Sequence, residues 1–199
     1  MTDKKNISAE DVKKLREQTG ASIMECKKAL EKSGGNLEEA IKYLRQSGKE
    51  KAGKKSERQT GEGVIASYIH SNKKVGSMVE LRCETDFVAK NSEFQELAYD
   101  IAMHVAAMAP RYVSIKKIEK NDLDEYEKIV REEVSGEKKP ADIIEKIVEG
   151  KIKKHFAEIS LMSQPFVKNN EMTIEDLIKE KIAKIGENIQ IGRIERFEI

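Results

Sequence analysis

A strand that runs into a helix through a short turn is the feature that most constrains how this chain can fold. Residues 75–83 alternate Val, Ser, Val, Leu and Cys with Gly, Met, Glu and Arg, the period-2 pattern of a half-buried strand. From Ser92, apolar residues recur at helical spacing as far as Met108, and Pro110 cannot continue that helix. The turn between them, residues 85–91, is therefore held by two rigid elements, and turns held in this way often carry function.

The tip of this turn carries an acid and an aromatic side chain, which simple alternation does not place in a core. It reads Thr85-Asp86-Phe87-Val88. In a structural interpretation, Asp86 or Ser92 caps the following helix by accepting bonds from its free N–H groups, and Phe87 folds back as a hydrophobic staple. In a functional interpretation, these side chains contact a partner. The residues alone leave both open and favour the structural one.

Before this region, residues 8–46 predict three short helices. Each begins with a side chain that can cap it, followed three residues later by an acid: Ser8 with Asp11, Ser22 with Glu25, and Asn36 with Glu39. A bundle of about 40 residues is near the lower limit of independent stability. It resembles the ubiquitin-associated fold, so we expect residues 1–47 to form a partner-binding domain. The alternative is that the bundle only packs on the rest of the chain.

Residues 48–62 are polar and predict a basic linker, part of which could be helical. The stretch from Gly48 to Gly61 holds five basic and two acidic residues. A nucleic-acid-binding patch is the functional alternative. No aromatic residue is interleaved for base stacking, which favours the linker.

Residues 63–199 predict an α+β core, made of a small antiparallel sheet with packed helices. Residues 64–69 and 75–83 form a β-hairpin. A last helix begins near Thr173, and residues 189–199 alternate as a closing strand. Gly192 interrupts that alternation, as a β-bulge does.

A helical hairpin is predicted within this core, at residues 121–157. Two apolar stripes indicate its arms, and residues 136–140 make the turn between them. The outer faces are charged, as in an arm that projects into solvent. Residues 163–167, which follow the hairpin, are predicted to be a loop.

Composition excludes several classes of protein. The chain has 199 residues and a net charge of +1, which gives no overall attraction to nucleic acid or to an anionic membrane. No apolar run approaches the ~18 residues that cross a bilayer, and the N-terminus lacks the apolar region of a signal peptide. Cys26 and Cys83 lie on apolar faces without a CxxC motif, as expected of buried reduced thiols in a cytoplasmic protein.

No catalytic or metal site is predicted. The histidines are far apart in the sequence, and none has a His or Cys partner at metal-ligand spacing: His70, His104 and His155. His104 falls within a predicted helix and is expected to be structural. There is no phosphate-binding loop and no nucleophile motif. We therefore expect a binding protein without a cofactor and without bond chemistry of its own.

Ordered motifs along nearly the whole chain resemble translation elongation factor Ts, whose signature is the tetrapeptide at Thr85–Val88. The other similar stretches lie in the same order as in that family: residues 12–20, 24–30, 83–91, 101–107, 148–151 and 164–167. Such ordered matches are highly specific. Longer members carry two related subdomains in the core, whereas this chain has room for about one, so it resembles the short form.

The resemblance implies a guanine-nucleotide exchange factor whose partner is elongation factor Tu. It assigns Thr85, Asp86, Phe87 and Val88 to a wedge that disturbs the Mg2+ site of that partner. Asp86 would disrupt the water shell of the metal, and Phe87 would insert between helices. The open edge of a half-core also predicts a homodimer, and hence a 2:2 complex with elongation factor Tu.

Two other functions remain open from the sequence. A general adaptor would bind proteins through residues 1–46 alone and would not depend on Asp86. An RNA-binding factor would use the basic residues between Lys49 and Arg58 and would lose affinity steeply with salt. The near-zero net charge argues against direct binding of nucleic acid.

Overall fold

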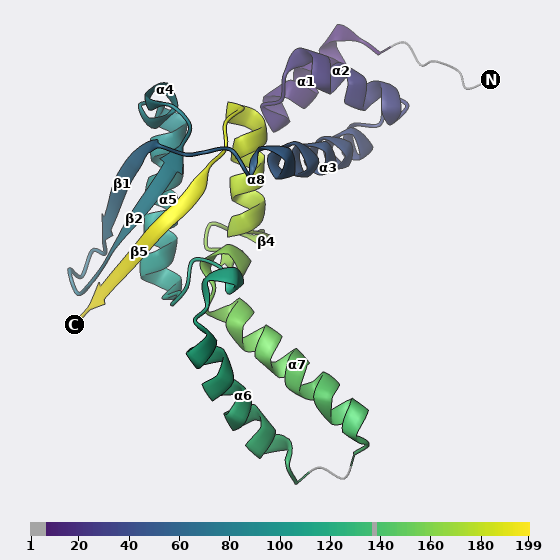
Figure 1. The fold of residues 1–199 in the computed structure, drawn as a ribbon. Helices are drawn as coiled ribbons and strands as arrows, with labels where there is room; N and C mark the ends of the chain where they lie inside the picture. Colours follow the sequence, from purple (N-terminus) through teal and green to yellow (C-terminus); the bar gives the residue numbers. More distant parts are fainter. Residues whose placement is uncertain (1–6, 137–138) are drawn as a thin grey trace. The chain divides into compact units, whose positions relative to one another are not determined.

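The computed structural model describes residues 7–136 and 139–199 (Figure 1). They fall into two compact units, which are described separately below. The N-terminal unit holds the described residues up to Gly63, together with Cys83–Val88 and Asp176–Gln190. The sheet unit holds Val64–Arg82, Ala89–Glu175 and Ile191–Ile199. These units do not coincide with the predicted domains 1–47, 48–62 and 63–199, and that division stays a prediction.

The N-terminal unit begins with the three predicted helices, which are α1 (Ala9–Thr19), α2 (Ile23–Lys32) and α3 (Leu37–Lys55). The side chains at the three predicted caps each accept a bond from the backbone N–H three residues on. At α2 the bonds are reciprocal, so Ser22 and Glu25 form a full capping box. Their shared core consists of Leu15, Cys26, Ala29, Leu30 and Ala40.

Helix α3 runs past the bundle predicted at residues 8–46, because residues 48–55, predicted as a linker that could be partly helical, continue the helix. Lys, Glu and Ala are good helix formers, and the basic last turn complements the helix dipole. Packing against α8 (Ile174–Ile185) adds to this. Ala52 is buried, Lys49 Nζ lies 2.7 Å from Asp176 Oδ1, and Lys55 Nζ donates to Gly186 O at 2.6 Å.

The sheet unit is built on three strands in the order β1-β2-β5. These are β1 (Glu62–Ile69), β2 (Val75–Cys83) and β5 (Gln190–Glu198). Strands β1 and β2 form the predicted hairpin. Strand β5 runs antiparallel to β2, since Ile199 N donates to Lys74 O at one end while Arg193 pairs with Glu80 further along. The predicted α+β class with a small antiparallel sheet is thus confirmed.

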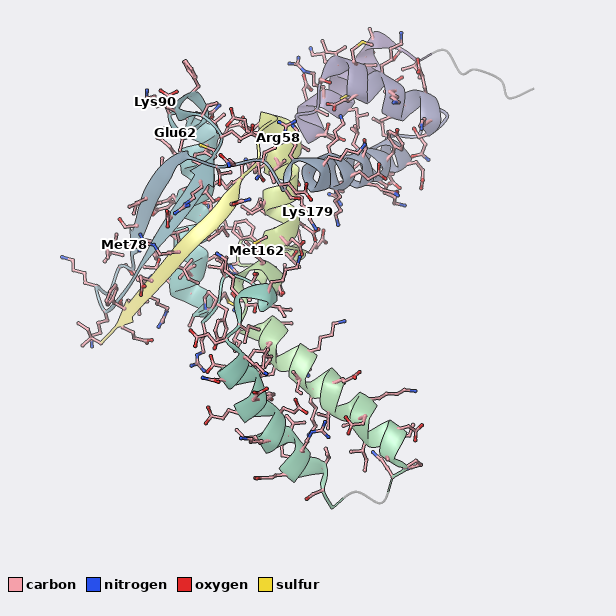
Figure 2. All side chains as sticks on the ribbon, viewed as in Figure 1. Arg58, Glu62, Met78, Lys90, Met162 and Lys179 are labelled. Atoms are coloured by element: carbon pink, nitrogen blue, oxygen red, sulfur yellow. The ribbon has the colours of Figure 1, made fainter. Side chains whose placement is uncertain are left out.

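One face of this sheet packs on α5 (Ser92–Met108), seen behind the strands in Figure 1. Ser77 Oγ donates to Ala102 O at 2.5 Å, and Val79 and Leu81 are fully buried. The alternate residues of β2 point the other way, and Met78, labelled in Figure 2, is exposed. The period-2 pattern therefore predicted the two faces of β2 correctly.

The predicted helical hairpin is present as α6 (Lys120–Val134) and α7 (Ala141–Glu158). Its seam buries Val130, Val134 and Val148, with four partly buried neighbours from the predicted stripes. Arg131 bridges the two arms through a forked pair with Glu145, at 2.7 and 2.9 Å. Of the predicted turn, residues 137–138 lie outside the described residues.

The prediction of a loop at residues 163–167 is wrong in part. Pro165–Phe166 forms strand β3, which pairs with β4 (Asn169–Thr173). Short 3-10 turns occupy Leu161–Ser163, just before it, and Ile115–Lys117, earlier in the chain. A two-residue strand gives no alternation to detect. Its backbone pairing, rather than its own sequence, defines it.

Buried polar groups hold this part of the sheet unit together around His104. Val167 N donates to His104 Nδ1 at 3.2 Å, so the ring proton resides on Nε2, which donates to Gln164 Oε1 at 3.0 Å. Gln164 Nε2 in turn donates to the carbonyls of Met108 and Glu158. Burial lowers the pKa of His104, although the bond to Gln164 acts in the opposite direction. The histidine is neutral and structural, as expected.

Candidate protein-binding site

The turn predicted between β2 and α5 is present, and it contains a single helical turn, α4 (Asp86–Ala89), which the sequence did not indicate. Thr85 begins this turn, because its Oγ1 accepts a bond from Val88 N at 3.4 Å. The Cys83 thiol, buried at the end of β2, donates to Thr85 O at 3.2 Å. The tetrapeptide Thr85–Val88 is therefore a defined conformation held from both sides by local bonds.

The structural interpretation of the tip is wrong for both of its side chains. Phe87 is 81% exposed, so it is not a staple on the helix. The cap of α5 is Asn91, whose side chain accepts from Glu93 N at 2.8 Å, and neither Asp86 nor Ser92 has that role. Asp86 is instead the first residue of α4 and is half-buried. The Phe87 ring is therefore available for contact with another molecule.

The carboxylate of Glu187, about a hundred residues further along the chain, accepts hydrogen bonds from the start of the turn. Glu187 Oε2 accepts bonds from Glu84 N at 3.1 Å and Thr85 N at 3.0 Å. Its second oxygen, Oε1, accepts from Thr85 Oγ1 at 2.7 Å. Three donors, one on Glu84 and two on Thr85, thus converge on one side chain. We call this group, Glu187 with Glu84 and Thr85, the carboxylate brace.

A second set of bonds runs in the reverse direction. Asn188 N donates to Glu84 Oε1 at 2.6 Å, and Arg58 Nη1 reaches the same oxygen at 3.4 Å. Asn188 is 1% exposed, and its amide donates to Ser56 O and Arg58 O at 3.3 and 2.8 Å. Arg58, labelled in Figure 2, lies just past the end of α3. The turn is therefore tied to the segment after α3 and to the segment after α8.

Sequence reasoning missed Glu84, Glu187 and Asn188. The two segments lie more than a hundred positions apart, and no local pattern connects them. One signal was available: Asn188 is polar at the start of a predicted strand, next to the apolar Ile189. A polar residue in such a place normally has hydrogen-bond partners, as it does here.

The described part of the chain was predicted to lack a metal site, and its acidic, histidine and cysteine side chains bear on that prediction. Over residues 7–136 and 139–199, no group of three or more His, Cys, Asp or Glu side chains is arranged to hold an ion. Cys26 and Cys83 are both buried, as predicted, and burial raises the pKa of Cys26. No helix among the described residues is long and apolar enough to span a membrane.

The arrangement is suited to contact with another protein. Aromatic side chains, phenylalanine included, are enriched in the cores of protein interfaces, and such residues contribute most when they fill a pocket on the partner. Phe87 is such a side chain, presented on a turn whose backbone is fixed by hydrogen bonds. These features are typical of a protein-binding protein, which contacts its partner through an exposed side chain such as Phe87.

The comparisons with known proteins identify the family. A sequence profile for the family described as Elongation factor TS matches residues 4–181. The chain is 53% identical to Elongation factor Ts of Thermosipho melanesiensis, over 97% of this chain and 98% of that protein. It is 52% identical to Elongation factor Ts of Thermodesulfovibrio yellowstonii, over 97% of this chain and 96% of that protein. The chain belongs to the elongation factor Ts family.

Proposed function

We propose that this protein is a guanine-nucleotide exchange factor for elongation factor Tu in translation elongation. The observation that carries the proposal is Phe87, which is 81% exposed at the tip of a braced turn. Covering this ring with a partner would remove apolar surface from water, which favours binding. Family membership makes elongation factor Tu the partner to test.

In the proposed mechanism, Thr85–Val88 acts as a wedge on the Mg2+ site of the partner. Asp86 brings negative charge that disrupts the water shell of the metal, while Phe87 inserts between two helices and shifts them. Loss of Mg2+ leaves the phosphate charge of GDP less neutralised, so GDP leaves faster. Release requires that the wedge bind the nucleotide-free state better than the GDP state, because only differential affinity shifts an equilibrium.

The remaining parts supply binding rather than chemistry. The bundle at residues 1–47 docks on elongation factor Tu, and two exposed apolar side chains at the start of α2, Ile23 and Met24, support this role. The hairpin at residues 121–157 contacts a further part of the partner. The protein makes or breaks no bond, needs no cofactor, does not bind nucleic acid or membrane directly, and acts in the bacterial cytoplasm.

We also propose a homodimer formed through the open face of the sheet, giving a 2:2 complex with elongation factor Tu. The face that does not pack on α5 exposes four apolar side chains from all three strands: Ile65, Ile69, Met78 and Phe197. Strands β1 and β5 are the edges of the sheet, and edges invite pairing with another chain. A second copy of the chain would cover the apolar face and the edges with its own equivalent surface, as in an isologous dimer.

The test is release of a fluorescent GDP analogue from purified elongation factor Tu, in the presence of Mg2+, with and without this protein. Strong acceleration at substoichiometric amounts is expected. Binding without acceleration would contradict the proposal and leave an adaptor that uses its N-terminal bundle. Binding to RNA that falls steeply with salt would instead favour the basic segment between Lys49 and Arg58.

A further inference from the structure

We infer that Glu187 is a positioning residue for the wedge, which it holds through Glu84 and Thr85. This inference rests on the exchange function proposed above and assigns a role to a residue outside the Thr85–Val88 tetrapeptide. The juxtaposition that carries it is three donors on one carboxylate: Glu84 N, Thr85 N and Thr85 Oγ1, at 3.1, 3.0 and 2.7 Å.

The chemistry of the contact favours a carboxylate at this position. Two consecutive backbone N–H groups point at the same oxygen, and a hydroxyl points at the other. An ionised carboxylate accepts at both oxygens and forms shorter and stronger bonds than a neutral acceptor does. Loss of the side chain would leave the half-buried N–H groups of Glu84 and Thr85 without this partner.

The contact restrains the turn at the residue that begins it. Thr85 Oγ1 both donates to Glu187 and accepts from Val88 N, so it links the brace to the first turn of α4. Glu84 returns the contact by accepting from Asn188 N at 2.6 Å. Because the two segments exchange bonds in both directions, Thr85 cannot move far without breaking at least one of them.

The restraint matters for exchange rather than for binding alone. An ordered wedge transmits displacement to the bound partner instead of yielding to it, so it favours the nucleotide-free state of the complex. A loosened wedge could still lie against the partner, since the ring remains, but it would push the metal site less. Glu187 should therefore affect the maximal rate of GDP release more than the concentration needed for half of that rate.

A purely structural role for Glu187 predicts something different. In that case its removal would lower the stability of the whole N-terminal unit and reduce the amount of active protein, without changing the maximal rate for each folded molecule. Coupling to Phe87 separates the two roles. Residues that act as one unit show non-additive effects, whereas independent sites add.

The experiment measures GDP release from elongation factor Tu, with full-length Glu187→Ala, Phe87→Ala and the double variant, over a range of exchanger concentrations. The matched control is Glu180→Ala, which removes an identical charge from an exposed position on α8. Circular dichroism melts establish that each variant is folded. Glu187→Gln, which keeps the length and one acceptor oxygen, serves as the conservative variant.

We expect Glu187→Ala to lower the maximal rate about tenfold, as befits loss of bonds to a charged acceptor, with little change in half-saturation. Glu187→Gln should recover part of the rate, and Glu180→Ala should match the wild type. In the Phe87→Ala background, removing Glu187 should change the rate less than twofold. A Glu187→Ala protein with the wild-type maximal rate, or fully additive effects, overturns the inference while the exchange function stands. If the wild type itself fails to accelerate release, the exchange proposal is the one that falls.

Discussion

Truncation of Phe87 is the most direct perturbation of the proposed wedge, because the exposed position of the ring means that the fold should be unaffected. The ring is 81% exposed, so Phe87→Ala removes almost no internal contact. Substitutions at such positions usually change the free energy of unfolding by less than about 0.5 kcal/mol. The helical turn is held at Thr85, through Val88 N and Glu187, and those bonds do not involve the ring.

The effect on exchange follows from the area available for burial. Burying a phenylalanine side chain completely is worth about 1.5–3 kcal/mol, and most of this ring is still in water before the partner binds. If insertion in the partner buries it, its loss should cost about 2 kcal/mol of stabilisation in the exchange-competent complex. That corresponds to roughly a thirtyfold lower rate of GDP release at subsaturating exchanger.

The assay is stopped-flow release of a fluorescent GDP analogue from elongation factor Tu at fixed Mg2+, alongside a thermal melt of each variant. Met108→Ala, a truncation of an apolar residue that is 43% exposed at the end of α5, is the matched control. The control should release GDP at the wild-type rate. A Phe87→Ala protein that melts normally and still exchanges within a factor of two of wild type would refute the reasoning.

Three other predictions concern the remaining elements. Ile65→Asp on the open sheet face should weaken the proposed homodimer at least tenfold, since the dimer would bury the charge. Sedimentation velocity measures this, and an unchanged dimer would place the interface elsewhere. Stability should fall as the pH drops below about 6.5, the ordinary pKa of histidine, because burial lowers the pKa of His104 and the unfolded chain takes up the proton first. Urea midpoints at pH 7.5 and 5.5 report this, and a His104→Phe protein with the same slope would contradict it. Gly20→Ala should destabilise the bundle by about 1–2 kcal/mol, because Gly20 ends α1 at a φ of +66°. An unchanged melting temperature would show that the cap tolerates a side chain.

The sequence predicted well what local spacing determines. Alternation in residues 75–83 separated the buried Val79 and Leu81 from the exposed Met78. Helix starts were predicted at their caps because a capping side chain is itself a local signal, as at Ser22. The end of α3 was not predicted, since residues 48–55 are polar and carry no apolar stripe, and their contacts with α8, such as Lys49 with Asp176, are invisible to local spacing.

For the candidate site too, the sequence predicted the location but not the conformation. Residues 85–88 stood out because they lie between two regular elements and because their sequence resembles a family signature. The conformation of the turn could not be predicted, since Thr85 is held by Glu187, which is distant in the sequence. The residues alone favoured a staple for Phe87, but in the structure hydrogen bonds hold the backbone at Thr85 while the Phe87 ring stays exposed.

The polar nature of the brace explains how an exposed aromatic residue can persist at this turn. An apolar brace would offer the ring a surface to pack on, and burial of the ring there would compete with burial in a partner. Glu187 instead holds backbone N–H groups and a hydroxyl, which fixes the turn without adding apolar surface beside it. The free energy of covering Phe87 thus remains available to the proposed complex. In the proposed mechanism, exchange depends on stronger binding to one state of the partner than to the other. A wedge whose backbone is fixed and whose aromatic ring is still exposed can contribute most to that difference in binding free energy.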